Sequence, residues 1–86
     1  MMNKDEVLAV LHHRESAPVE LAIALVNLSR NEEVVVELCG RKRMTQYEAA
    51  EKMDKSPDAV QKWWSSATKK LGETWDGMQW VRNMTK

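Results

Sequence analysis

The sequence predicts an all-α protein of five to six short helices. Its 86 residues include only three glycines and two prolines, and 43% are hydrophobic, a composition that suits one small packed helical domain. Apolar residues recur at three- and four-residue steps, which is the spacing of a buried helix face. Serine or threonine precedes glutamate by three residues at Ser29 and at Thr45, and this capping box favours a helix start.

Residues 1–28 are expected to form an acidic helical scaffold. Apolar side chains at helical spacing predict one short helix over residues 4–13. Ser16 and Pro18 indicate a second start, because serine caps free backbone amides and proline is tolerated in a first turn. This second helix runs to about Leu28 in the prediction. Its residues are nearly all apolar, so we expect it to be buried on most sides.

A third helix is predicted to begin at Ser29, which forms a capping box with Glu32. The valines at 34–36 would also suit a strand, but the capping box and the neighbouring glutamates favour a helix. Gly40 is the expected left-handed stop at its end. Cys39 is the only cysteine, and its apolar surroundings predict a small buried side chain rather than a nucleophile.

A fourth helix of about nine residues is predicted to begin at Thr45, which pairs with Glu48 as a second capping box. Its apolar residues are Tyr47, Ala49, Ala50 and Met53. Ser56 followed by Pro57 is the strongest helix start in the chain, a capping serine before a proline at the first helical position. The short first helix, the short turn and the capped second helix together predict a helix-turn-helix.

The fifth helix is predicted to run to about Leu71 and to end at Gly72. Val60, Trp64 and Ala67 form its apolar stripe together with Leu71, and with Met53 they are expected to fill the space beneath the turn. Residues 72–86 are then a tryptophan-rich C-terminal helix or tail.

Charge is distributed unevenly although the net charge is zero. Residues 1–40 carry three basic and seven acidic side chains, whereas residues 41–71 carry eight basic and four acidic ones. A basic segment beside an acidic one indicates a region that faces an anion and a separate region that avoids phosphate.

The run from Leu28 to Leu71 resembles region four of bacterial sigma factors and the output domains of response regulators, which read a promoter element or operator. The similarity covers LSRNEEVVVEL and MTQYEAAEKMDKSPDAVQKWWSSATKKL without a gap. The small residue of the family stands at Ala50, and its Ser, Val, large apolar and Ala pattern at Ser56, Val60, Trp64 and Ala67. The resemblance implies that residues 57–66 contact DNA, that the upstream helix buttresses them, and that residues 29–71 form a sigma region-four-like helix-turn-helix domain.

Several positions depart from the family pattern. The family has glycine and then an apolar residue in the turn, where this chain has Asp54 and Lys55; aspartate tolerates a left-handed conformation, so the turn is expected to persist. Trp63 and Ser66 replace arginines, so phosphate anchoring is expected to be weaker. The chain has no room for the promoter-melting regions of a full sigma factor, and it resembles small phage-encoded regulators and sigma-like accessory factors.

The predicted partner is double-stranded DNA. Gln61 can pair with adenine, Lys62 can reach guanine or phosphate, and Ser65 permits close approach. The candidate DNA-binding residues are Arg41, Arg43, Thr45, Gln46, Ser56, Pro57, Asp58, Ala59, Gln61, Lys62, Ser65 and Lys69.

RNA polymerase or a second copy of the chain are the expected protein partners, because one short helix supplies few base contacts. The alternative is a protein-protein interaction module derived from a helix-turn-helix, favoured by Trp63, Trp75 and Trp80, since tryptophans beyond the needs of a small core often lie at interfaces.

We expect no enzymatic activity, cofactor or metal site, because the sequence has no catalytic constellation or phosphate loop. His12 and His13 are adjacent and would point about 100° apart on a helix. No stretch is long enough for a membrane span and no signal core follows the N-terminus, so the expected location is the cytoplasm.

Overall fold

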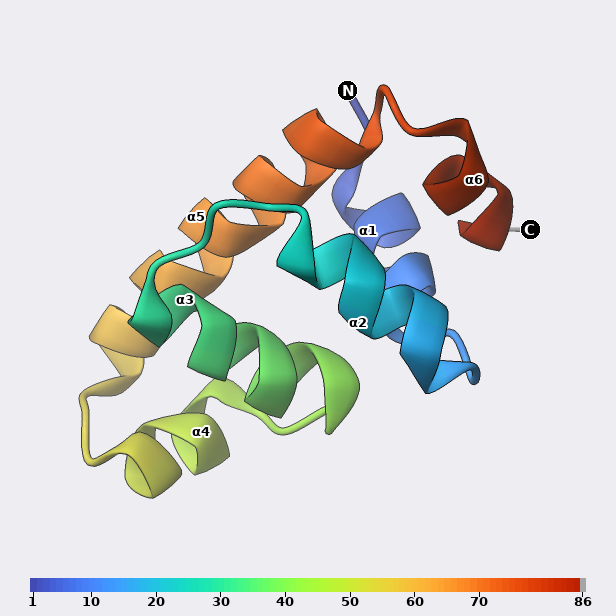
Figure 1. Cartoon of the computed structure of the whole chain (residues 1–86). Helices are drawn as coiled ribbons and strands as arrows, with labels where there is room; N and C mark the ends of the chain where they lie inside the picture. The colour runs from blue at the N-terminus through green and yellow to red at the C-terminus, as the bar shows by residue number, and fades with distance from the viewer. Residues whose placement is uncertain (86) are drawn as a thin grey trace. The chain divides into compact units, whose positions relative to one another are not determined.

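The computed structural model describes residues 1–85, and its regular secondary structure is entirely helical (Figure 1). No strand occurs between residues 1 and 85. The α-helices are α1 (Lys4–Leu11), α2 (Ser16–Ala24), α3 (Arg30–Val35), α4 (Gln46–Met53), α5 (Pro57–Trp75) and α6 (Gln79–Arg82), with a π-helix η1 (Val36–Arg41) and a 3₁₀ helix η2 (Asn83–Thr85). The predicted all-α class with five to six short helices is confirmed.

The chain divides into two compact units. Residues 1–27 form the first unit together with the chain from residue 68 onward, and residues 28–67 form the second. The C-terminal segment therefore shares a unit with the N-terminal helices. No helix within residues 1–85 combines the length and the apolar character that crossing a membrane requires.

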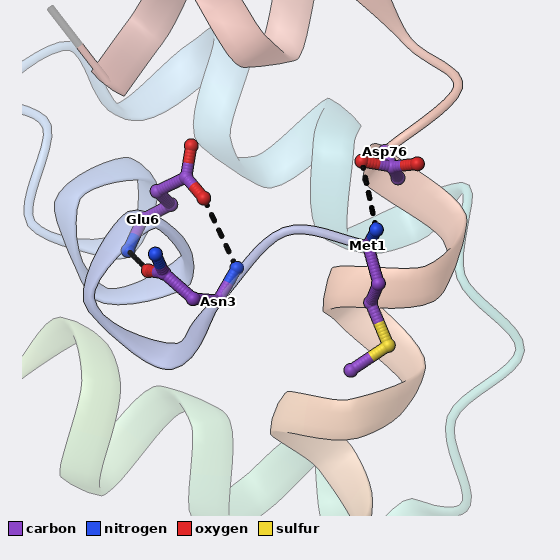
Figure 2. A network of polar contacts seen from close by, with 4 residues as sticks. All are labelled: Met1, Asn3, Glu6 and Asp76. Atoms are coloured by element: carbon purple, nitrogen blue, oxygen red, sulfur yellow. Dashed lines mark hydrogen bonds and ion pairs between the residues drawn. The ribbon is translucent and has the colours of Figure 1, made fainter.

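The first unit begins with a capped helix (Figure 2). The Asn3 side chain accepts a hydrogen bond from the Glu6 amide at 2.8 Å, and the Glu6 carboxylate accepts one from the Asn3 amide at 3.1 Å. The amino group of Met1 lies 3.4 Å from the Asp76 carboxylate, just beyond the end of α5. The ion pair of Met1 and Asp76 links the first residue to the end of α5, while η2 and α6 pack against α1.

The second helix differs from its prediction. No side chain caps α2, whose N-cap residue is Glu15 rather than Ser16, and the helix ends at Ala24 rather than near Leu28. Leu21 and Leu25 are 55% and 50% exposed, so the expectation that this segment is buried on most sides was wrong. The two leucines are four residues apart and share one helix face, whereas the residues that face the core are Val19, Ala22 and Val26.

The last turn of α5 also departs from the prediction, because Gly72 does not end the helix. Gly72 is buried within α5, and a Cβ at this position would lie 2.7 Å from the carbonyl oxygen of Met2. Trp75 is fully buried, and its indole N–H donates to the Ala22 carbonyl at 2.9 Å. The interface role considered for Trp75 was therefore wrong: this ring belongs to the core of the first unit, while Trp80 is 41% exposed.

In the second unit the capping box of Ser29 is confirmed, with Ser29 and Glu32 hydrogen bonds of 2.8 and 3.3 Å. The predicted stop at Gly40 was wrong. Gly40 is buried within η1, and none of the described glycines has a positive φ. The π-helix η1 continues to Arg41, and the residue in the left-handed conformation is Arg43, with φ of 57°. A hydrogen bond of 2.9 Å from the Met44 amide to the Leu38 carbonyl closes this turn.

We expect Gly72→Ala to destabilise the protein by about 1–3 kcal/mol, because the new methyl group meets a backbone oxygen that cannot rotate away. The gain in helix propensity, at most about 1 kcal/mol, offsets only part of this cost. Urea unfolding monitored by tryptophan fluorescence measures the change. Gly77→Ala is the matched control, since nothing lies within 4 Å of its added Cβ, and equal stability of the two variants would contradict the proposed close approach.

Candidate nucleic-acid interface

A three-residue turn separates α4 from α5. Asp54 is left-handed, with φ of 56° and ψ of 46°. The Lys55 amide donates to the Ala50 carbonyl at 2.9 Å, and the Asp54 amide donates to the Glu51 carbonyl at 3.2 Å. This pair of hydrogen bonds is the Schellman motif, which normally places glycine at the left-handed position. The expectation that aspartate can hold the turn is confirmed.

Both helices of this pair begin at the predicted caps. The Thr45 hydroxyl accepts from the Glu48 amide at 3.1 Å, and the Glu48 carboxylate accepts from the Thr45 amide at 3.0 Å. The backbone hydrogen bond from Thr45, assisted by that of its side chain, holds the pKa of Glu48 below its ordinary value. The Ser56 hydroxyl accepts from the Ala59 amide at 3.2 Å, with Pro57 at the first helical position.

The N-terminal half of α5 has one buried and one exposed side. Val60 and Ala67 are fully buried and Trp64 is 7% exposed, as the apolar stripe predicted. The polar residues predicted to point outward are all exposed: Asp58, Gln61, Lys62 and Ser65. The structure thus presents a polar helix face on an apolar support, and contact of this face with DNA stays a prediction.

The remaining candidate residues vary in exposure and position. Arg43, Thr45, Ser56, Pro57 and Lys69 are exposed, whereas Arg41, Gln46 and Ala59 are half-buried. All except Lys69 belong to the second unit, since Lys69 lies in the part of α5 assigned to the first. The second unit alone therefore carries the candidate interface from Arg41 to Ser65.

Close packing beneath the turn uses smaller residues than expected. Ala49 is fully buried and Ala50 is 3% exposed, which permits the α4 backbone to approach its neighbours. Met53 is only half-buried, so it fills less of this space than predicted. Trp63 is also half-buried, as is Cys39, where desolvation by burial raises the pKa of the thiol.

Sequence reasoning missed one surface of α4. Tyr47, grouped with the apolar residues of this helix, is 75% exposed. A groove of 370 Å³ is lined by Met44, Glu48, Glu51 and Lys52. The available signal was the position of Tyr47 two residues before the buried Ala49, which places the two side chains on different helix faces.

Within residues 1–85, no group of three or more histidine, cysteine or acidic side chains is arranged to hold a metal ion. Comparisons of the chain with protein-family models, curated proteins and solved structures find no match.

We expect Asp54→Ala to destabilise the protein by about 1 kcal/mol, because alanine in a left-handed conformation places Cβ close to the following carbonyl and lacks the local hydrogen bonding of aspartate. Asp54→Gly should match or exceed the wild type, since glycine adopts this conformation without steric cost. Urea denaturation of the three proteins measures the order. If Asp54→Ala proves more stable than Asp54→Gly, residue 54 does not adopt the left-handed conformation.

The capping box predicts a pH dependence. The pKa of Glu48 is lower in the folded protein than its ordinary value of 4.5, so its ionised form stabilises the fold above 4.5 and this contribution is lost as pH falls through the folded pKa. As pH falls from neutral to well below 4.5, the melting temperature of the wild type should decrease more than that of Glu48→Gln, whose amide can still cap the helix. Thermal unfolding of the two proteins at several pH values measures this difference. Parallel stability curves for the two proteins would rule out this contribution.

Proposed function

We propose that the protein is a sequence-specific DNA-binding transcription regulator of the cytoplasm, with residues 57–66 as its recognition helix. The observation that carries the proposal is that α5 is amphipathic: it exposes polar side chains on the face opposite the buried Val60 and Trp64. A helix supported in this way can enter the major groove of B-DNA with its polar side toward the base edges.

The exposed side chains supply complementary hydrogen-bonding groups. Gln61 can donate to and accept from adenine, Lys62 can donate to guanine or to a phosphate, and the Asp58 carboxylate can accept from the amino group of cytosine. Asp58 lies three residues before Gln61 and four before Lys62, so each of the two neighbours it on the exposed surface. This combination favours base reading over general attraction to phosphate.

Phosphate contacts come from the residues around the start of α4. Arg43 is exposed in the connector, and Thr45 begins the helix. Because the net charge of the chain is zero, few phosphates are neutralised, and affinity falls with salt by a slope of only a few units. A second copy of the chain or RNA polymerase would supply the additional contacts that one short recognition helix lacks.

A protein-interaction module is the second candidate function. Two observations favour it: the zero net charge, which is unusual for a nucleic-acid-binding protein, and Trp80, which is 41% exposed at the C-terminal end of the first unit. In that function the helix-turn-helix remains a scaffold, and the binding surface lies elsewhere on the chain.

The decisive test begins with selection of bound fragments from random duplex DNA by the full chain. We expect an enriched sequence motif, and we expect the double variant Gln61→Ala, Lys62→Ala to bind it about ten to a hundred times more weakly, because base-directed hydrogen bonds are lost. Fluorescence anisotropy at fixed salt concentration measures the affinities.

The matched control is Lys4→Ala with Gln79→Ala, which removes the same two residue types from exposed positions of the first unit. Its affinity should equal that of the wild type. If no motif is enriched, or if both double variants bind as the wild type does, the recognition helix has no such role and the interaction-module function is favoured.

A further inference from the structure

One face of α2 is both apolar and exposed. Leu21 and Leu25 are 55% and 50% exposed, and Ala17 and Ala24 are exposed beside them. Ala17, Leu21 and Leu25 follow one another at four-residue steps, which places them in one row along the helix, with Ala24 next to this row. We call these four residues the α2 stripe. Apolar side chains that are exposed side by side indicate an interaction surface.

The charges of α2 limit the kind of partner that the stripe can take. The only charged side chain of the helix is Glu20, so α2 offers no cation to a phosphate, and nucleic acid is disfavoured. A helix that lies on a membrane surface carries lysine and arginine on its polar face, whereas the other side of α2 is buried in a protein core through Val19 and Ala22. The stripe therefore fits an apolar protein surface.

The order of large and small side chains makes the α2 stripe complementary to itself. Ala17 lies four residues before Leu21, and Leu25 lies four residues after it. If two copies of α2 pack antiparallel with a two-fold axis beside Leu21, each Leu25 meets the partner's Ala17, because both lie about one turn from the axis. A large side chain then fills the space that a small one leaves. A parallel pair would place leucine against leucine and alanine against alanine.

The net charge of the chain favours the same partner. Two copies of a strongly charged protein repel each other, whereas this chain has 13 basic and 13 acidic residues, so long-range repulsion between copies is small. Glu20 is exposed and lies at the edge of the stripe, where solvent and salt screen its charge. The zero net charge that weakens attraction to DNA therefore removes an obstacle to self-association.

The length of α2 determines the strength of this contact. Its nine residues span about 13 Å at the helical rise of roughly 1.5 Å per residue. Two such helices bury less than the ~800 Å² per partner of a standard stable interface. The expected dissociation constant is therefore micromolar rather than nanomolar, and the dimer forms at high concentration or on a ligand that holds both copies.

We propose that two copies of the chain associate through the α2 stripe, as an antiparallel helix pair centred on Leu21. No residue of the stripe is among the candidate DNA-binding residues, so the two surfaces do not compete for the same side chains. The association itself does not depend on DNA binding. Its role rests on the proposed function, because a second copy supplies the second recognition helix that one short helix lacks.

Sedimentation equilibrium of the full chain, from about one to several hundred micromolar, tests the association. We expect the mean mass to rise from that of one copy toward that of two. Leu21→Gln with Leu25→Gln should weaken association about tenfold or more, because it places polar groups in an apolar contact, while glutamine retains a helix propensity close to that of leucine. Circular dichroism checks that the variant remains helical.

Tyr47→Gln with Trp80→Gln is the matched control. These two residues are the large apolar side chains outside α2 that are 75% and 41% exposed, and their replacement should leave association unchanged. A mass of one copy at every concentration would overturn the proposal, as would equal losses of association in the two double variants. Self-association that is absent while the stripe binds vesicles of phosphatidylcholine and phosphatidylserine would assign it to a lipid surface instead and would also overturn the proposal.

Cysteine pairs test the antiparallel arrangement. With Cys39→Ser in every chain, an equimolar mixture of Ala17→Cys and Leu25→Cys should form a disulfide-linked dimer containing one copy of each when oxidised in air with copper phenanthroline. Two copies of residue 17 would lie eight positions apart along the pair, about 12 Å, which exceeds the ~7 Å between Cα atoms that a disulfide spans. Mass spectrometry identifies the products, and preferential linkage of either variant to itself would contradict the antiparallel pair.

The outcome is independent of the DNA-binding experiment. Association through the stripe without an enriched DNA motif would support the dimer and count against the proposed function. DNA binding by a chain that remains a monomer would overturn the dimer alone. Gln61→Ala with Lys62→Ala should leave self-association unchanged, so a failure of either proposal is recognised without the other.

Discussion

The backbone of Asp54 fixes the geometry on which the candidate interface depends. Its left-handed conformation reverses the chain after α4, and the two hydrogen bonds of the Schellman motif join the turn to the last residues of that helix. A residue in the right-handed helical conformation at this position would extend α4 and displace Ser56, which caps α5. The direction of the polar face of α5 thus follows from one residue conformation, with the buried Ala49 and Ala50 providing the space for close approach.

The electrostatic character of the second unit is local rather than global. The chain has no net charge, so a broad field cannot bring it to DNA, and recognition would depend on short-range hydrogen bonds from α5.

Three helix starts were read correctly from residues three positions apart, whereas the cap expected at Ser16 is absent. Ser29, Thr45 and Ser56 each accept the hydrogen bond expected of a capping residue. The reason is physical: the donor and the acceptor of a cap lie within one turn, so their approach requires only the local backbone. The same locality explains why the exposed side of α5 was predictable from the steps between its apolar residues.

Helix ends and burial were predicted poorly where they depend on distant residues. Gly72 remains helical, and it is the Met2 carbonyl that makes a small residue necessary there; nothing near Gly72 in the sequence indicates this contact. Trp75 can be buried because its indole N–H donates a hydrogen bond to the carbonyl of Ala22, more than fifty residues earlier in the chain. The groove at α4 is a similar case, since the Met44 amide donates to the carbonyl of Leu38, which lies within a π-helix that composition does not reveal.

This difference between local and distant determinants also bears on function. The candidate recognition surface is built from one helix and its cap, so its chemistry follows from the order of residues between Ser56 and Ser65. The groove requires α4 and the turn after η1 together, because Met44 comes from the connector and Glu48, Glu51 and Lys52 come from the helix. Two left-handed residues, Arg43 before α4 and Asp54 after it, set the direction of the chain on either side of this helix.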